Sequence, residues 1–418
     1  MIKRYISQFI KDSLKDFPAV LISGARQVGK STLAHQLKEE GIIDHYLALD
    51  DINNLESALT NPDGFINQFQ GSIAIDEIQR APDLLRAIKK SIDEERRPGR
   101  FLLTGSANIL SYPGVNESMA GRMDIIPIEG LSLGELQSYP NPSTFIEDLF
   151  LTNDLLELAK KWNQILTQRP PLDRKKLLDH IFFGSYPDVV LKNNLRFRDR
   201  WFSAYESAYI ERDVRNLSNL LNIISFAKLY KLLGLNTGHL VNHSELGMEA
   251  KLDHRTVTRY IEILELTFQL NVLRPWFTND RKRYVKTPKV YVADSGQACY
   301  LSGINNPNLL RSHPSVGALF ETWVWGEIRK LLALSHGIDS HFYRTSTGQE
   351  VDFLLNRGSQ YWGIECKWSE TLQKDDFKSL THMTESIGPN SRGLILYTGK
   401  TIFLFSETLM AVPIGLLA

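Results

Sequence analysis

Two glycines, a lysine and a serine near the start of the chain have types and a spacing that suit phosphate chemistry. Residues 24–31 match the pattern G-x-x-x-x-G-K-[ST]. In this pattern the glycines let backbone N–H groups wrap a phosphate, the lysine adds positive charge and the hydroxyl holds Mg²⁺. The stretch therefore predicts binding of a nucleoside triphosphate with Mg²⁺. The predicted binding residues are Gly24, Ala25, Arg26, Gln27, Val28, Gly29, Lys30, Ser31 and Thr32.

A second pair of residues suits hydrolysis of the bound nucleotide. The apolar run 72–75 is followed directly by Asp76 and Glu77. Ligands of a parallel sheet bind where its strands end. We expect Asp76 to hold Mg²⁺ together with Ser31, and Glu77 to act on the attacking water as a general base.

Three further polar residues are candidates for contact with the reacting phosphate. Ser106 and Asn108 follow the apolar run 100–104, where either side chain can reach the γ-phosphate or the attacking water. Arg122 can stabilise the charge that develops on the phosphate. Two alternatives stay open, because the first two residues also suit a polar turn and Arg122 also suits a salt bridge.

The segments around these residues predict the elements that must position them. The apolar run 19–22 predicts a buried strand before the loop, and 32–40 predicts a helix after it. Further apolar runs at 46–49, 72–75, 100–104 and 125–128 alternate with helical stretches such as 82–95. This alternation predicts an α/β fold, with a P-loop NTPase core and a mainly parallel sheet over residues 1–136.

These segments together resemble a family of prokaryotic AAA+-type ATPases with a C-terminal domain of unknown function. The resemblance covers nearly the whole chain and implies binding and hydrolysis of ATP at Lys30, Ser31, Asp76 and Glu77. ATPases of this class often assemble into a homo-oligomer, which the sequence itself does not fix. This chain has Ala25 where the family often has proline, and Ser31 in place of threonine, which keeps the hydroxyl. The resemblance in the first domain rests on residues 24–31, 75–79, 103–106 and 120–122.

The composition limits the classes of function. The chain has 418 residues, enough for several domains, and a formal net charge of +0, so any nucleic-acid surface must be a local patch. The 2 cysteines, Cys299 and Cys366, form no disulfide framework and fit a reducing cytoplasm. No apolar stretch is long enough to span a membrane, and residues 1–12 are unlike a secretion signal.

The middle of the chain predicts a connector and helical lid over 137–235, then a winged-helix-like module over 236–280. Within this module, residues 255–261 predict the second helix of a helix-turn-helix, whose exposed residues can enter a DNA major groove. A helical hairpin that packs domains together is the open alternative. The basic run 281–289 suits either DNA phosphates or a solvated hairpin, and Asp294 suits either an acid catalyst or a structural turn.

The last part, 281–418, predicts a restriction-endonuclease-like α/β domain. Glu365 and Lys367 alternate along one predicted strand and so share a face, and a hairpin at 356–360 brings Asp352 beside them. We expect Asp352 and Glu365 to bind Mg²⁺, Glu321 to add a ligand and Lys367 to position a water. The pattern resembles the PD-(D/E)xK phosphodiesterase core, with Val351 in place of the proline.

Two functional hypotheses follow. In the first, the ATPase drives a DNA-processing enzyme whose last domain is a metal-dependent nuclease. In the second, the chain is a nucleotide-switched regulator or assembly factor, and its last domain is catalytically inactive and binds a protein partner. The two hypotheses differ in the roles of Asp352, Glu365 and Lys367.

Overall fold

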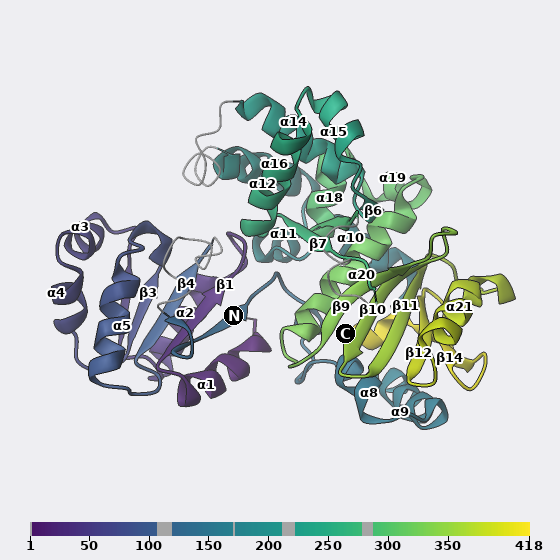
Figure 1. Cartoon of the computed structure of the whole chain (residues 1–418), viewed down its shortest axis with the longest axis horizontal. Helices are drawn as coiled ribbons and strands as arrows, with labels where there is room; N and C mark the ends of the chain where they lie inside the picture. The colour runs from purple at the N-terminus through teal and green to yellow at the C-terminus, as the bar shows by residue number, and fades with distance from the viewer. Residues whose placement is uncertain (1, 107–118, 170–171, 211–221, 278–286) are drawn as a thin grey trace. The chain divides into compact units, whose positions relative to one another are not determined.

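The computed structural model of the chain describes residues 2–106, 119–169, 172–210, 222–277 and 287–418 (Figure 1). The chain divides into two compact units, which are described one at a time. The first unit contains residues 1–131 with the short segments 186–188 and 266–269, and the second contains the remainder. The predicted Asn108 lies outside the described residues.

The first unit is built on a five-stranded sheet in the order β2-β3-β4-β1-β5. All four pairings between these strands are parallel, as the alternation of strands and helices predicted. The strands are β1 (Ala19–Ser23), β2 (His45–Ala48), β3 (Ile73–Asp76), β4 (Phe101–Gly105) and β5 (Met123–Pro127).

Helices cover this sheet and form its core. Leu85 and Ile88 of α5 pack in one cluster with Ala19 and Leu21 of β1. Val20 and Ile22 alternate with these strand residues and are also fully buried, so both faces of β1 are covered. The helices are α1 (Ile6–Asp16), α2 (Lys30–Glu39), α3 (Ile52–Thr60), α4 (Pro62–Asn67), the 3₁₀ turn η1 (Ile78–Arg80) and α5 (Leu84–Glu94).

The middle of the chain is mainly helical, as expected of a lid. Asp154, Asp173 and Asn194 cap three of its helices by accepting hydrogen bonds from backbone N–H groups of the first turn. The helices are α7 (Leu133–Leu136), α8 (Phe145–Leu151), α9 (Leu155–Thr167), α10 (Arg174–Phe183), α11 (Pro187–Lys192) and α12 (Leu195–Ala208).

A small module follows, in which the described residues form three helices and three strands. Its sheet is antiparallel in the order β6-β8-β7, and this element order is the one expected of a winged helix. We expected this module to end at residue 280, but it also includes strand β8, which lies beyond that residue. Strand β8 belongs to the module because it pairs with β6 and β7. The elements are α14 (Ile223–Leu235), β6 (His239–Leu240), α15 (His243–Ala250), α16 (His254–Leu266), β7 (Leu270–Leu273) and β8 (Lys289–Val292).

The last part of the chain forms a six-stranded mixed sheet in the order β13-β14-β12-β11-β10-β9. Strands β10 and β11 form the predicted hairpin, and β11 pairs in parallel with β12. The sequence predicts a strand over 401–405, of which β13 covers only Phe403–Leu404, and it does not predict β14. The strands are β9 (Asp339–Arg344), β10 (Glu350–Arg357), β11 (Gln360–Lys367), β12 (Ser391–Tyr397), β13 (Phe403–Leu404) and β14 (Leu409–Pro413).

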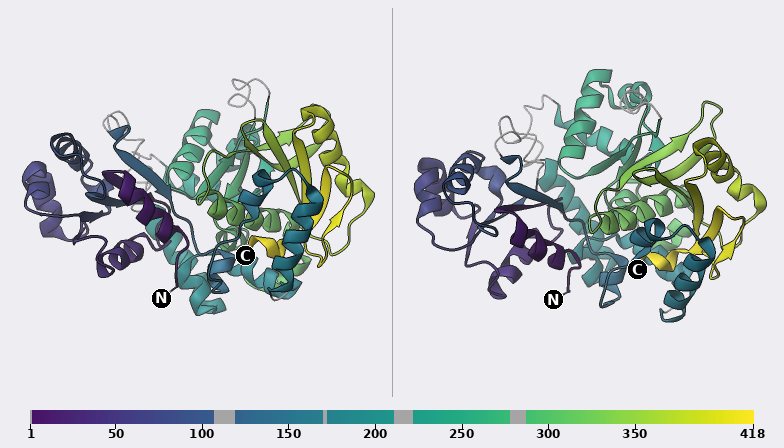
Figure 2. Two further views of the ribbon diagram at one scale, coloured as in Figure 1. Left: turned by 90° about the horizontal axis from the view of Figure 1, so that it is seen from below. Right: turned by 60° about the horizontal axis from the view of Figure 1, so that its bottom comes forward.

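Helices α20 and α21 pack on opposite faces of this sheet (Figures 1 and 2). Phe353 of β10 stacks on Trp325 of α20, with ring centroids 4.9 Å apart. Its neighbour Leu354 points to the other face and packs with Leu380 and Met383 of α21. The remaining helical elements are α18 (Ser295–Leu301), α19 (Pro307–Ser312), α20 (Val316–Leu332), η4 (Lys374–Phe377), α21 (Lys378–Ile387) and η5 (Ile414–Leu417).

Among the described residues, no helix combines the length and apolar character needed to cross a membrane.

Candidate functional site

The predicted phosphate loop connects β1 to α2. Gly29 has φ +100° and Gln27 has φ 64°, so the loop passes twice through the left-handed region. A Cβ on Gly24 would lie 2.2 Å from the carbonyl oxygen of Ile128, so this position requires glycine. Lys30 is 4% exposed, and its Nζ donates to the carbonyl oxygens of Gly24 (3.0 Å) and Ala25 (2.8 Å).

Asp76 lies at the end of β3 and collects hydrogen bonds from three other elements. Its Oδ1 accepts from Ser31 Oγ at 3.0 Å and from Thr104 Oγ1. Its Oδ2 accepts from the Tyr46 hydroxyl at 2.8 Å. Burial, and then the Asp76 charge, raise the pKa of Tyr46 well above its usual range, so the phenol keeps its proton and acts as a donor.

The predicted partners Ser31 and Asp76 therefore lie together, and the sequence analysis missed Thr104 and Tyr46. Both are placed by the strand order, since β2 and β4 flank β3. Thr104 is the second-last residue of β4. Its place near the end of a strand is the one feature of the sequence that could have identified it.

Glu77 follows β3 directly and has a left-handed backbone, with φ 59°. Its N–H donates to Thr104 Oγ1 at 3.1 Å. Its Oε2 accepts a hydrogen bond from Gln79 Nε2 and a longer one, 3.4 Å, from Ser106 Oγ. The structure thus brings Ser106 to Glu77, and it adds Gln79, which the sequence analysis did not single out.

Arg122 forms a salt bridge, which the sequence analysis left open as the alternative to contact with phosphate. Its Nε donates to Asp93 at 2.7 Å in an exposed ion pair. The hydrogen bond from Arg122 lowers the pKa of Asp93 below its usual value. In this arrangement the guanidinium is engaged by a carboxylate of α5, and its role toward phosphate stays a prediction.

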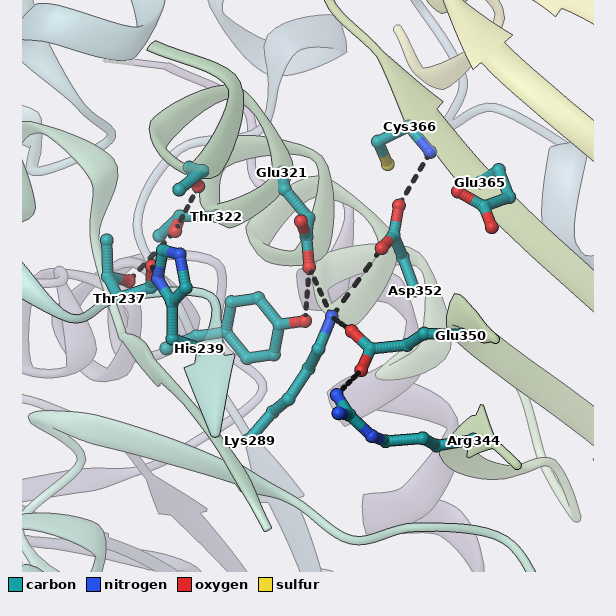
Figure 3. Close-up of polar contacts among 12 residues, drawn as sticks. Thr237, His239, Lys289, Glu321, Thr322, Arg344, Glu350, Asp352, Glu365 and Cys366 are labelled. Atoms are coloured by element: carbon teal, nitrogen blue, oxygen red, sulfur yellow. Dashed lines mark hydrogen bonds and ion pairs between the residues drawn. The ribbon is translucent and has the colours of Figure 1, made fainter. Parts of the chain in front are cut away.

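A second polar cluster surrounds Lys289 of β8 (Figure 3). The side chain is 3% exposed, and its Nζ lies 2.6 Å from Glu350, 3.1 Å from Glu321 and 3.5 Å from Asp352. The Tyr291 hydroxyl donates to the same Glu321 oxygen at 2.6 Å. We expected Lys289 to belong to a solvated or phosphate-binding basic run, so this buried position is a correction. Residues 281–286 of that run lie outside the described part of the chain.

The predicted metal ligands of this domain are engaged by nitrogen donors. Asp352 lies where the pairing of β10 with β9 shifts register. Its Oδ1 faces Lys289, and its Oδ2 accepts from the backbone N–H of Cys366 at 2.8 Å (Figure 3). Glu365 lies 3.6 Å from Lys367 Nζ, so these two residues form an ion pair. Within the described residues, no three His, Cys, Asp or Glu side chains are grouped to hold a metal ion.

Burial perturbs the carboxyl groups of this cluster. Burial, and next the Asp352 charge, raise the pKa of Glu321 to about 7, although Lys289 and Tyr291 oppose the rise. Burial likewise raises the pKa of Glu365 well above its usual range. The carboxylate partners raise the pKa of Lys289 in spite of its burial, so its ammonium stays charged.

Asp294 has the structural role that we weighed against catalysis. Its Oδ1 caps α18 by accepting from Gln297 N–H at 2.9 Å, and its Oδ2 accepts from Ser185 N–H at 2.7 Å. A Cβ on Gly184 would lie 2.1 Å from Asp294 Oδ1. The end of α10 and the start of α18, which are far apart in the sequence, thus pack against each other at Gly184 and Asp294.

Helix α16 presents polar residues to solvent near its start. His254, Arg255 and Arg259 are exposed, and Thr258 donates to the His254 carbonyl oxygen at 3.0 Å. The His254 ring stacks on His243 of α15, with centroids 4.9 Å apart. The predicted exposure of this face is present, and its use toward DNA stays a prediction.

Domain-family models match three successive parts of the chain. An AAA domain matches residues 16–137. A domain of unknown function (DUF8612) matches 174–308, and another (DUF4143) matches 316–417. With the parallel sheet and the phosphate loop, the first match defines a P-loop ATPase domain of the AAA type.

Two curated relatives span nearly all of the chain. They are uncharacterized proteins of Mycobacterium tuberculosis and Mycobacterium bovis, each 25% identical over 406 residues, which cover 97% of this chain and 82% of the relative. Among solved structures, a Walker-type ATPase of Pyrococcus abyssi is 12% identical and covers 72% of this chain and 96% of its own, with a TM-score of 0.42. The DNA clamp loader delta protein of Bacillus subtilis is 11% identical, covers 67% and 90%, and has a TM-score of 0.26.

Proposed function

We propose that the first domain hydrolyses ATP in the presence of Mg²⁺. The observation that supports this best is the 3.0 Å contact between Ser31 Oγ and Asp76 Oδ1, which joins the phosphate loop to the end of β3. Mg²⁺ prefers oxygen ligands and binds proteins through one or two carboxylates plus substrate phosphates. This donor set fits that ion, so Ser31 and Asp76 would hold it.

Each residue of the site has a separate role in hydrolysis. Lys30 and the backbone N–H groups of the loop bind the phosphates. Bound Mg²⁺ supplies positive charge that offsets the charge of the reacting phosphate. Glu77 accepts the proton of the attacking water, and Ser106 lies beside it to contact the γ-phosphate or that water.

Two substitutions separate binding from hydrolysis. Lys30→Ala removes the phosphate charge partner, and we expect loss of ATP binding in a calorimetric titration with Mg²⁺. Glu77→Gln keeps the size of the side chain and removes the base, so it should bind ATP and turn it over slowly. Lys38→Ala is the control, because Lys38 is an exposed lysine on the same helix. Equal turnover in wild type and Glu77→Gln would remove Glu77 as the base.

We propose that the last domain has a restriction-endonuclease-like core. Its element order from α20 through β9, β10, β11 and α21 to β12 supports this. Asp352 lies on β10 and Glu365 and Lys367 lie on β11, the two strands of one antiparallel hairpin. Glu321 of α20 shares the Lys289 ammonium with Asp352. The resemblance to the PD-(D/E)xK core assigned its acidic and basic residues to these same positions.

Of the two functional hypotheses, we infer that the nucleotide-switched regulator is the better one. Lys289 favours it, because its ammonium lies among the carboxylates that a metal-dependent nuclease needs for its ion. The ammonium contacts an oxygen of each of these three carboxylates, so it occupies part of the space in which a metal ion would bind. In this proposal the last domain binds a protein partner without cutting DNA, and ATP hydrolysis controls that binding.

A cleavage panel tests this choice. Purified wild-type protein is incubated with linear, supercoiled, single-stranded and branched DNA in Mg²⁺ or Mn²⁺. We expect every substrate to stay intact. Cleavage that Asp352→Ala and Lys367→Ala both abolish would instead support the DNA-processing hypothesis and refute the inactive domain.

A further inference from the structure

We propose that Gln79 is a positioning residue for ATP hydrolysis, which holds the Glu77 carboxylate beside Ser106. This inference rests on the proposed ATPase function and adds a residue to its site. Gln79 Nε2 donates to Glu77 Oε2 and also to Ser106 Oγ, the latter at 2.8 Å. Because a primary amide carries two N–H groups, these two bonds use both of its donors.

The orientation of the amide follows from its neighbours. An ionised carboxylate only accepts hydrogen bonds, so the nitrogen of Gln79 must face Glu77. The Oε1 atom then points elsewhere, is buried and has no hydrogen-bond donor among the described residues. A buried acceptor without a donor costs about 1–3 kcal/mol.

The backbone around Gln79 is fixed well enough to aim this side chain. Gln79 is the middle residue of the 3₁₀ turn η1, which begins at Ile78. Ile78 is fully buried in the core cluster of the first unit. Arg80 N–H donates to the Glu77 carbonyl oxygen at 3.0 Å, which closes the turn. The turn therefore carries the amide back over the carboxylate two residues earlier.

A glutamate needs such a partner to act as a base. Its side chain has several rotatable bonds, and a general base must lie within hydrogen-bond reach of the water that it activates. Preorganised geometry at a reacting centre is worth several kcal/mol of activation energy. The left-handed backbone of Glu77 and its N–H bond to Thr104 fix its Cα, and Gln79 fixes the carboxylate.

The test compares Gln79→Ala and Gln79→Glu with wild type by steady-state ATP hydrolysis and by calorimetric binding of ATP with Mg²⁺. The first variant removes the amide, and the second keeps its shape but places a carboxylate against Glu77. We expect kcat to fall at least about tenfold in both, since general base catalysis contributes about 10²–10⁴-fold. The KM for ATP and its binding should stay within about threefold, because uniform binding is unchanged.

Gln36→Glu is a matched control. Gln36 Nε2 also donates to a glutamate, Glu40, at 2.8 Å, but at an exposed position of α2. The same chemical change there should leave kcat unchanged.

The double variant Glu77→Gln with Gln79→Ala shows whether Gln79 acts through Glu77. If it does, loss of the amide should have no further effect once the base is gone. The positioning role would be refuted if Gln79→Ala lowered kcat by the same factor in wild type and in Glu77→Gln. It would also be refuted if Gln79→Ala and Gln79→Glu both kept the wild-type kcat. Either of these results would leave the proposal of ATP hydrolysis by the first domain unaffected. Wild-type protein that hydrolyses no ATP would refute both proposals.

Discussion

Replacement of Lys289 by methionine tests the ion cluster of the last domain. The change keeps most of the side-chain length and removes the ammonium, which lies within 2.6–3.5 Å of three carboxylates. Removing one partner of a buried ion pair costs about 3–5 kcal/mol. The side chains of Glu321 and Glu350 keep 15% and 22% exposure, so water screens part of the repulsion. We therefore expect the free energy of unfolding to fall by about 3 kcal/mol at pH 8.

The expected loss depends on pH through Glu321. Its pKa rises from 4.5 to about 7 in the folded protein, and Lys289 limits that rise. Between these two values the folded state binds the Glu321 proton more tightly than the unfolded chain, so stability falls as the pH rises toward 7. Without the ammonium the pKa of Glu321 rises further, and this fall continues above pH 7. The methionine variant should therefore lose less stability at pH 6 than at pH 8.

Tryptophan fluorescence during urea unfolding measures this effect selectively. All seven tryptophans belong to the second unit, so their signal follows its unfolding: they are Trp162, Trp201, Trp276, Trp323, Trp325, Trp362 and Trp368. Arg274→Met is the control, because Arg274 lies 3.9 Å from Glu265 in a pair whose side chains are 42% and 35% exposed. Exposed pairs contribute about 1 kcal/mol or less. Equal losses in the two variants, or a larger loss at pH 6 than at pH 8 for Lys289→Met, would refute the reasoning.

Two further predictions concern the joint between α10 and α18. Gly184→Ala adds a Cβ that meets Asp294 Oδ1 at 2.1 Å and forces φ +76° on alanine, whereas Gly303→Ala at φ +74° has open space around it. We expect Gly184→Ala to lower the urea midpoint clearly more than Gly303→Ala, and equal midpoints would show that the clash is relieved. Burial lowers the pKa of His180 from 6.5 to about 4. The unfolded chain therefore binds this proton more tightly, and stability is lost as the pH falls from about 6.5 toward 4. His180→Phe should reduce the acid loss by up to about 3 kcal/mol, and an unchanged pH profile would count against a neutral His180.

Local patterns were sufficient to predict the first sheet and the nucleotide residues. The runs 19–22, 73–75 and 101–103 are apolar throughout, as strands covered on both faces require, and each predicted run matches a strand to within one or two residues. Asp76 and Glu77 follow one such run, so their place at the sheet edge needed no knowledge of distant contacts. The same reasoning predicted the β10–β11 hairpin, because polar residues separate two strand patterns.

The residues that the sequence analysis missed depend on distant contacts. Lys289 and Glu321 are 32 residues apart, and nothing in the sequence near Lys289 distinguishes it from the basic residues that precede it. Tyr46 reaches Asp76 across two adjacent strands, which requires the strand order to be known. Gln79 is different, since its spacing from Glu77 was visible and only its contact with Ser106 shows its role.

The Asp352 carboxylate shows how a nuclease-like pattern can exist without a free metal site. One of its oxygens faces the Lys289 ammonium and the other accepts the Cys366 N–H. Glu321 gives one oxygen to both Lys289 and Tyr291. Mg²⁺ demands nearly octahedral oxygen ligands at about 2.0–2.1 Å, so it competes with these donors for the same lone pairs. Because the ammonium contacts three carboxylates, entry of the ion at these oxygens would require the Lys289 side chain to move away. Metal binding and the Lys289 contacts therefore exclude each other in this arrangement.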